Sequence, residues 1–145
     1  MIELIDFILE NKITDKFVIA GYQTEEILQL YKNIPVNIEI KGAISNKELV
    51  DLYKNCKAIL INQRASSGAL TKLIELQIAG VPMIVNDLSL RSYSINSGCK
   101  SFHNHLELIS ILEHFVPEVP EYPNSIEVSE KSVTKKITEL LNKEH

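Results

Sequence analysis

KAILINQRASSGALTKLIELQIAGVPMIVND, from Lys57 to Asp87, is the stretch that decides the fold. It opens with a short apolar strand, KAILIN, and continues through a loop into a helical segment that ends at Gly80. It closes on a second apolar strand, VPMIVND. Strands that are apolar throughout are typical of a parallel sheet that helices cover on both faces. The stretch therefore predicts a strand, helix and strand unit of an α/β protein.

The same unit recurs on either side of this stretch. An apolar strand is expected at 17–21 and another strand at 36–42, and the segment 99–104 is compatible with a short strand. Ser45 followed by Glu48 predicts a capping box at the start of a helix. Gly80 suits the position just after a helix end. We expect one domain, residues 1–145, with a Rossmann-like, doubly wound parallel sheet and helices on both faces. Helices are expected at 2–10, 24–33, 45–55, 70–80, 105–115 and 129–143.

Composition excludes several classes of protein. The chain has 145 residues, a net charge of -4 and no clustered basic stripe, so nucleic acid is not an expected partner. Cys56 and Cys99 form no CxxC pair, which suits a reducing compartment, and we expect the cytoplasm. The longest apolar runs fall far short of the roughly 20 residues that span a bilayer.

The loop before the helix of this stretch carries the candidate chemistry. Ser66, Ser67 and Gly68 offer hydroxyl and backbone donors at a helix N-terminus, which favours an anion such as a diphosphate. Lys72 adds a cation, and Glu75 lies three residues further along the same helix face. A carboxylate accepts two hydrogen bonds, as a ribose diol would donate. The simpler readings are an ordinary N-cap and turn, with Lys72 and Glu75 as solvated helix residues.

At these residues the chain resembles a known family. SSGALTKLIELQIAGVPMIVND is similar to the signature of the retaining GT-B glycosyltransferases related to sucrose and glycogen synthases, in their C-terminal, donor-binding domain. KGAISNKELVDLYKNCKAILI and FVIAG resemble the stretches before it, so the resemblance spans about Phe17 to Asp87. It implies one half of a GT-B fold that binds a UDP- or GDP-sugar and transfers a hexose to an acceptor hydroxyl. As the family operates, no metal and no further cofactor is needed.

The resemblance also implies roles for single residues. Glu75 would contact the ribose and Lys72 the diphosphate. The backbone at the end of the second expected strand would contact the nucleobase, and the loop would line the diphosphate and sugar. The full set of candidate donor-binding residues is Gly42, Ala43, Ile44, Arg64, Ser66, Ser67, Gly68, Ala69, Leu70, Lys72 and Glu75.

The chain departs from the family pattern in three places. Ser67 stands where most members carry a first glutamate that contacts the donor sugar. In the family, a strand and a loop at the start of this domain carry an arginine and a lysine that clamp the diphosphate, and this chain has no counterpart of them. Arg64 either replaces part of that clamp or is an ordinary surface arginine. The N-terminal, acceptor-binding half also has no counterpart. We therefore expect this chain alone to transfer little or no sugar. The acceptor-binding half is an expected partner, and any peripheral contact with a membrane would be made through that half.

Two other functions compete with this one. The first is a non-catalytic Rossmann-like module that binds a nucleotide or a protein. The second is a flavodoxin-like or receiver-like domain, but a receiver needs an acidic cluster at strand ends and only Asp87 is suitably placed. His103 and His105 suggest a metal, yet no Asp, Cys or third His stands at ligand spacing nearby, so we predict no metal site.

Overall fold

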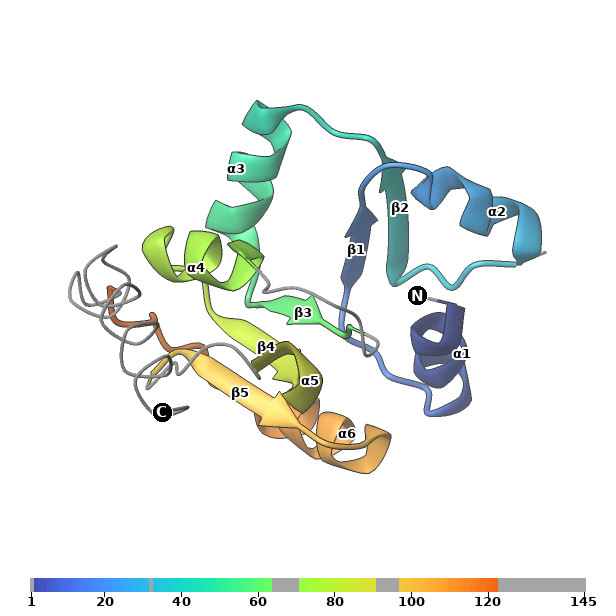
Figure 1. Ribbon diagram of the computed structural model, residues 1–145. Coiled ribbons are helices and arrows are strands. Elements are labelled where there is room, and N and C mark those ends of the chain that lie inside the picture. The colour runs from blue at the N-terminus through green and yellow to red at the C-terminus, as the bar shows by residue number, and fades with distance from the viewer. Residues whose placement is uncertain (1, 32, 64–70, 91–96, 123–145) are drawn as a thin grey trace, which may run out of the picture.

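Short strands form two sheets at the centre of the described part of the molecule (Figure 1). The computed structural model describes residues 2–31, 33–63, 71–90 and 97–122. Within them the backbone hydrogen bonds form a two-stranded sheet and a three-stranded sheet in which β4 is central, and every strand pair is parallel. The strands are β1 (Phe17–Ala20), β2 (Ile38–Gly42), β3 (Ile59–Ile61), β4 (Met83–Asn86) and β5 (Cys99–Phe102).

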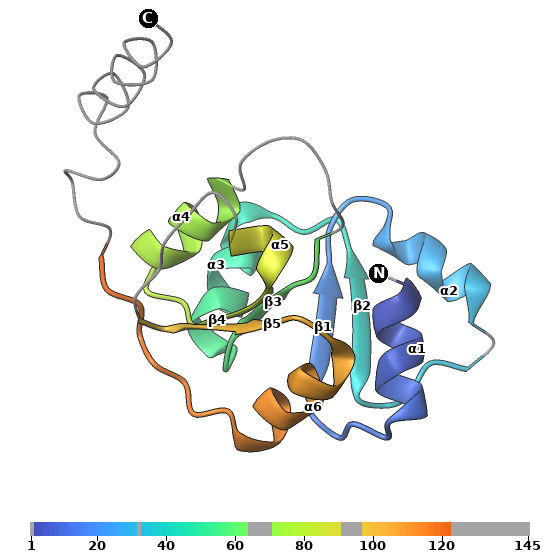
Figure 2. The ribbon, with the colours of Figure 1, turned by 60° about the horizontal axis from the view of Figure 1, so that its bottom comes forward.

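Helices connect these strands and cover the three-stranded sheet on both sides, which confirms the predicted α/β class. Figure 2 shows α6 on one side of that sheet and α4 on the other. No helix in the described ranges is long and apolar enough to cross a membrane. The helices are α1 (Ile2–Glu10), a 3-10 turn (Thr24–Glu26) that leads into α2 (Ile27–Leu30), α3 (Asn46–Asn55), α4 (Thr71–Ile78), α5 (Asp87–Leu90) and α6 (His105–His114).

The first hydrophobic core joins the two sheets. Ile5 and Ile8 of α1 pack with Ile84 of β4, Phe102 of β5 and Leu108 of α6. Ile19 and Ile38, from β1 and β2, belong to the same cluster. Full burial of such side chains contributes about 1.5–3 kcal/mol each. The two sheets are thus held together by side-chain packing rather than by backbone pairing.

The second core lies on the other face of β4, beneath α4. Leu73 and Leu76 are fully buried there because their spacing of three residues places both on one helix face. Met83 and Val85 meet them, whereas Ile84 points into the first core. Side chains alternate along a strand. This is why Met83, Ile84 and Val85 of β4 are all apolar.

Two elements differ from their predictions. The helix expected at 24–33 is a 3-10 turn followed by the single turn α2, and Tyr31 already has an extended backbone. A tertiary contact accompanies that early end, since the Tyr31 hydroxyl donates to Asp6 Oδ1 at 2.7 Å. Asp87, expected in a strand, instead begins α5. The helix predicted at 129–143 lies outside the described residues.

Candidate functional site

The carboxyl ends of the parallel strands are where ligands of doubly wound folds bind. In the described structure β1 ends at Ala20 and β2 at Gly42, and Gly21 N donates to Gly42 O at 2.7 Å. β3, β4 and β5 end near Gln63, Asn86 and His103. Of the predicted donor residues that the structure describes, Gly42, Ala43 and Ile44 lie at this edge, and Lys72 and Glu75 lie on α4, the helix between β3 and β4.

Lys72 and Glu75 lie in direct contact on α4. Lys72 Nζ is 3.0 Å from Glu75 Oε2, and the side chains are 42% and 59% exposed. The pair lies at the solvent-facing border of the helix, beside the face that Leu73 and Leu76 turn into the second core. Both charged groups are therefore accessible to a ligand.

Tyr53 of α3 lies under the Lys72 ammonium. Lys72 Nζ is 5.4 Å from the centroid of the Tyr53 ring. The contact with Tyr53 is the main cause that raises the pKa of Lys72; Glu75 adds to the rise, and desolvation opposes it. The buried Tyr53 hydroxyl makes no hydrogen bond of ordinary geometry with the described residues, so we treat the contact as electrostatic attraction between the cation and the ring. Lys72 stays charged across the physiological range.

Gly42, Ala43 and Ile44 form the turn from β2 into α3. Gly42 has a φ of +69°, which favours glycine, and a Cβ there would overlap the side chain of Glu25. Ala43 is exposed and Ile44 partly buried. The predicted capping box follows directly, since Ser45 Oγ accepts from Glu48 N and the Glu48 carboxylate accepts from Ser45 N at 2.8 Å. The backbone conformation and the nearby Glu25 side chain are enough to explain why a glycine stands at position 42.

The structure brings some of the candidate residues together and leaves others apart. No hydrogen bond or ion pair of the described residues joins Lys72 or Glu75 to the turn at 42–44. Gly80 has the expected left-handed conformation, with a φ of +68°. The remaining candidates lie outside the described residues: Arg64, Ser66, Ser67, Gly68, Ala69 and Leu70.

An amide network closes the edge between β3 and β4. Asn86 Nδ2 donates to Gln63 O at 2.6 Å, and Gln63 N donates to Asn86 Oδ1 at 3.1 Å. The hydroxyl of Ser89, a buried residue of α5, also donates to Asn86 Oδ1. Sequence reasoning missed this network because its members come from separate elements and match no motif.

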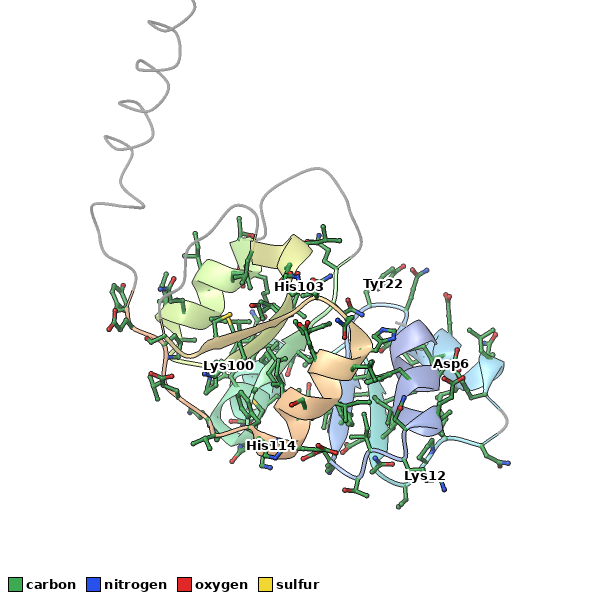
Figure 3. All side chains as sticks on the ribbon, turned by 90° about the horizontal axis from the view of Figure 1, so that it is seen from below. Asp6, Lys12, Tyr22, Lys100, His103 and His114 are labelled. Carbon is green, nitrogen blue, oxygen red and sulfur yellow. The ribbon has the colours of Figure 1, made fainter. Side chains whose placement is uncertain are left out.

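A second polar contact lies at the ends of β4 and β5. His103 Nδ1 contacts Asp87 Oδ2, and His103 N donates to Glu107 Oε2 at 2.9 Å. Figure 3 labels His103 where β5 leads into α6. The sequence places no Asp near His103, but parallel pairing of β4 with β5 puts Asp87 beside it. Among the described residues no three His, Cys, Asp or Glu side chains gather as metal ligands do.

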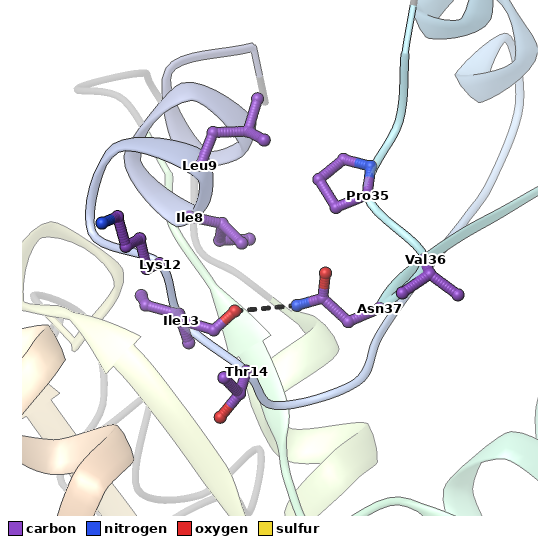
Figure 4. A pocket seen from close by; sticks show the side chains of 8 residues that line it. All are labelled: Ile8, Leu9, Lys12, Ile13, Thr14, Pro35, Val36 and Asn37. Carbon is purple, nitrogen blue, oxygen red and sulfur yellow. Dashed lines mark hydrogen bonds between the residues drawn. The ribbon is translucent and has the colours of Figure 1, made fainter.

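The amino ends of β1 and β2 border a pocket on the opposite edge (Figure 4). Its volume is about 370 Å³ and its walls are largely apolar. Asn37 crosses one end of it and donates to Ile13 O at 2.8 Å. No candidate donor residue lines it. The lining residues are Ile8, Leu9, Lys12, Ile13, Thr14, Pro35, Val36 and Asn37.

The two cysteines are unpaired and packed against the second core. Burial raises the pKa of the Cys56 thiol, and raises that of Cys99 to about 11. Because the thiolate is the nucleophile, both groups are poorly reactive in the folded protein.

No protein-family model matches the chain, and no curated protein matches it with significant similarity. The resemblance to the GT-B glycosyltransferases therefore rests on the quoted residues, whereas the α/β architecture rests on the structure.

Proposed function

We propose that this domain binds the nucleotide-sugar donor of a retaining glycosyltransferase and that Glu75 contacts the ribose. The observation that carries the proposal is the exposed Lys72 and Glu75 pair on the helix after β3. That helix is also the most specific part of the family resemblance. A cation and a carboxylate side by side match a ligand that carries a phosphate next to a diol.

The two side chains would exchange partners when the donor binds. An exposed ion pair is worth only about 0–1 kcal/mol, so ligand oxygens can replace it at little cost. Lys72 would then contact the diphosphate, and its raised pKa keeps it cationic. Glu75 would accept hydrogen bonds from the ribose hydroxyls. The proposed donor is a UDP- or GDP-sugar, with the leaving diphosphate stabilised by donors and basic side chains rather than by a metal.

The remaining contacts are assigned by the family resemblance. The turn at Gly42, Ala43 and Ile44 would contact the base, and exposed Ala43 gives a ligand access to it. Arg64 and the run from Ser66 to Leu70 would line the diphosphate and sugar. We propose that hexose transfer to an acceptor hydroxyl also needs an acceptor-binding partner half, and that the protein works in the cytoplasm, which its unpaired cysteines suit.

A non-catalytic nucleotide-binding or protein-binding module is the second candidate. Ser67 favours it, because this residue stands where the family usually has its sugar-contacting glutamate. Both candidates allow nucleotide binding, and only the first requires transfer once an acceptor-binding half is supplied.

Calorimetric titration with UDP, GDP and their hexose conjugates tests the proposal. Wild type should bind one nucleotide series, and Glu75→Ala should weaken binding about tenfold or more, since a hydrogen bond to a charged group is worth about 1.5–3 kcal/mol. Glu113→Ala, which removes an exposed carboxylate from α6, is the matched control and should bind as wild type. Undiminished binding by Glu75→Ala would sink the ribose assignment. A wild type that binds neither series would refute the donor-binding function.

A further inference from the structure

β1 and β3 are the strands at which the two sheets meet. Within the described ranges β1 pairs only with β2, and β3 pairs only with β4. Figures 1 and 2 both show β1 between β2 and β3, so the unpaired side of β1 lies toward β3. We call the unpaired sides of β1 and β3 the inner strand edges. The far sides of β2 and β5 are the outer strand edges.

The backbone groups on the inner strand edges follow from the hydrogen bonds on the paired sides, because these groups alternate in direction along a strand. Phe17 N donates toward β2 at 2.7 Å, so Val18 and Ala20 turn their N–H and C=O groups to the inner edge. Ile59 N donates toward β4 at 2.9 Å, so Leu60 does the same on β3. Among the described residues no strand pairs with these groups. Such a row of unpaired groups is a template for a further strand.

Charged residues mark the outer strand edges and are missing from the inner ones. β2 carries Glu39 and Lys41, whose side chains are 3.0 Å apart, and β5 carries Lys100. β1 reads FVIA and β3 reads ILI. Proteins use charges on an edge strand to prevent pairing with other chains. By this criterion β2 and β5 are built as edge strands, whereas β1 and β3 are built as interior ones.

Burial of the side chains points the same way. β3 is as apolar as β4, yet Ile59, Leu60 and Ile61 are only partly buried, whereas the three apolar residues of β4 are buried. Val18 of β1 is 37% exposed. An interior strand of a parallel sheet is normally covered on both faces. β1 and β3 therefore keep apolar surface that a neighbouring strand would cover.

The strand order also leaves a position open between β1 and β3. In the common dinucleotide-binding order of doubly wound sheets, the first strand lies between the second and the fourth. If β1 to β5 are counted as the second to the sixth strand of that order, all observed neighbour pairs agree with it. The position that is left over lies between β1 and β3.

We infer that an extended apolar strand from another polypeptide inserts between β1 and β3, parallel to both, and joins the two sheets into one. This is strand addition, in which main-chain bonds give affinity and side-chain fit gives specificity. No ladder bond breaks on insertion, because the described strands of the two sheets share none. The inference does not depend on nucleotide binding.

The chemistry of the inserted strand follows from its neighbours. Leu60 packs against the first core, whereas Ile59 and Ile61 pack against the second, so a strand beside β3 has an apolar core on each face. It should be apolar at about four successive positions, to match the four residues of β1 and the three of β3. The segments outside the described ranges contain no run of four apolar residues, so we assign the strand to another polypeptide.

Amide hydrogen exchange of the whole chain tests the inference with a synthetic peptide, in which a short run of valine and isoleucine stands between pairs of lysines. Bound peptide should slow exchange at Val18, Ala20 and Leu60 about tenfold or more, because it supplies their hydrogen-bond partners. Ser101 is the matched amide on an outer strand edge, since Met83 N donates to Gly98 O and the alternation turns Ser101 N–H away from β4. Its exchange should not change.

A pair of variants separates the inner strand edge from the outer one. Val18→Pro removes an N–H that makes no bond to β2, and Ser101→Pro makes the same change on the outer edge of β5. Val18→Pro should weaken binding of the labelled peptide at least about tenfold in fluorescence anisotropy, and Ser101→Pro less than about twofold. Should Val18→Pro not fold, Val18→Lys and Ser101→Lys form the second pair, because a charge on an edge strand also opposes pairing.

Each outcome decides the inference. Unchanged exchange at the three inner-edge amides up to the solubility limit of the peptide, or equal weakening in both variants, would overturn it. Slow exchange before any peptide is added would also overturn it. If that protection rises with protein concentration, a second copy pairs with these edges, and if it does not, a segment of this chain does. Titration with nucleotides answers separately for the proposed function.

Discussion

The two edges of the three-stranded sheet are built from different groups. At the amino edge the backbone closes on itself: Ile59 N donates to Pro82 O at 2.9 Å, and Met83 N donates to Gly98 O at 2.8 Å. At the carboxyl edge side chains make the contacts, among them Asn86 to Gln63 and His103 to Asp87. Backbone bonds survive most changes of side chain, whereas side-chain contacts do not. Changes of side chain should therefore disturb the carboxyl edge more readily than the backbone bonds of the amino edge.

The largest expected effect is at Gly98, on the amino edge. This glycine has a φ of +66°, and a Cβ there would lie 2.7 Å from Glu118 O and would overlap the backbone of Pro120. Gly98→Ala should therefore cost about 3 kcal/mol, since left-handed backbone and a backbone collision add together. Urea unfolding measures the loss.

Gly80→Ala is the control for Gly98. Its φ of +68° is nearly the same, but its Cβ would meet only Val119 Cγ1 at 3.5 Å, an ordinary contact. It should cost about 1 kcal/mol. Equal losses of unfolding free energy in the two variants would show that the left-handed backbone, and not the collision with Glu118 and Pro120, causes the loss at Gly98.

An intermediate effect is expected at the capping box on the carboxyl edge. Ser45→Ala removes the N-cap of α3 and should cost about 1 kcal/mol at neutral pH. Hydrogen bonds from the Ser45 hydroxyl, then from its backbone N–H, hold the pKa of Glu48 below its usual value. A depressed folded-state pKa gives stability that is present above the unfolded-state pKa and is lost as the pH falls through the folded-state one.

The gap between wild type and Ser45→Ala should accordingly narrow below about pH 4. Urea unfolding at neutral and acidic pH measures it. Lys47→Ala, an exposed change in the same helix, should stay within about 0.5 kcal/mol of wild type. A gap that does not depend on pH would assign the whole effect to the hydroxyl and none to the carboxylate.

The smallest expected effect is at Tyr31, which ties the end of α2 to α1. Desolvation, then the hydrogen bond and charge of Asp6, raise the pKa of Tyr31 to about 12 from 10.0. A raised folded-state pKa means stability that is present below pH 10 and lost as the pH rises toward 12. The advantage of wild type over Tyr31→Phe should disappear across that interval in chemical unfolding.

Tyr22→Phe makes the same change at an exposed tyrosine. It should show no such dependence. If the two variants respond alike to alkaline pH, the Asp6 contact contributes nothing to stability.

Local patterns predicted the elements of this fold well. The expected strands are β1 to β5, Ser45 and Glu48 form their capping box, and Gly80 follows its helix as expected. These features depend on neighbours within a few residues, and such neighbours are visible in a sequence. The helix expected at 24–33 was too long, because tertiary contacts and not propensity decide where α2 ends.

The candidate site was predicted only in part. Lys72 and Glu75 share a helix face, so their contact follows from their spacing. The Asn86 network and the contact of His103 with Asp87 join different strands, and the register of β4 with β5 has to be known before they can be found. Whether Glu75 binds a ribose stays a prediction, because no ligand chemistry follows from the helix alone.

The packing of the two cysteines makes opening of the second core measurable in the unmodified protein. Cys56 and Cys99 both lie against that core, and burial keeps their thiols protonated. Both thiols are only partly exposed, so a thiol reagent should react faster when the layer beneath α4 opens. A change in the rate of alkylation therefore reports a change in that local opening, and under the proposed function a bound nucleotide would slow it without any introduced label.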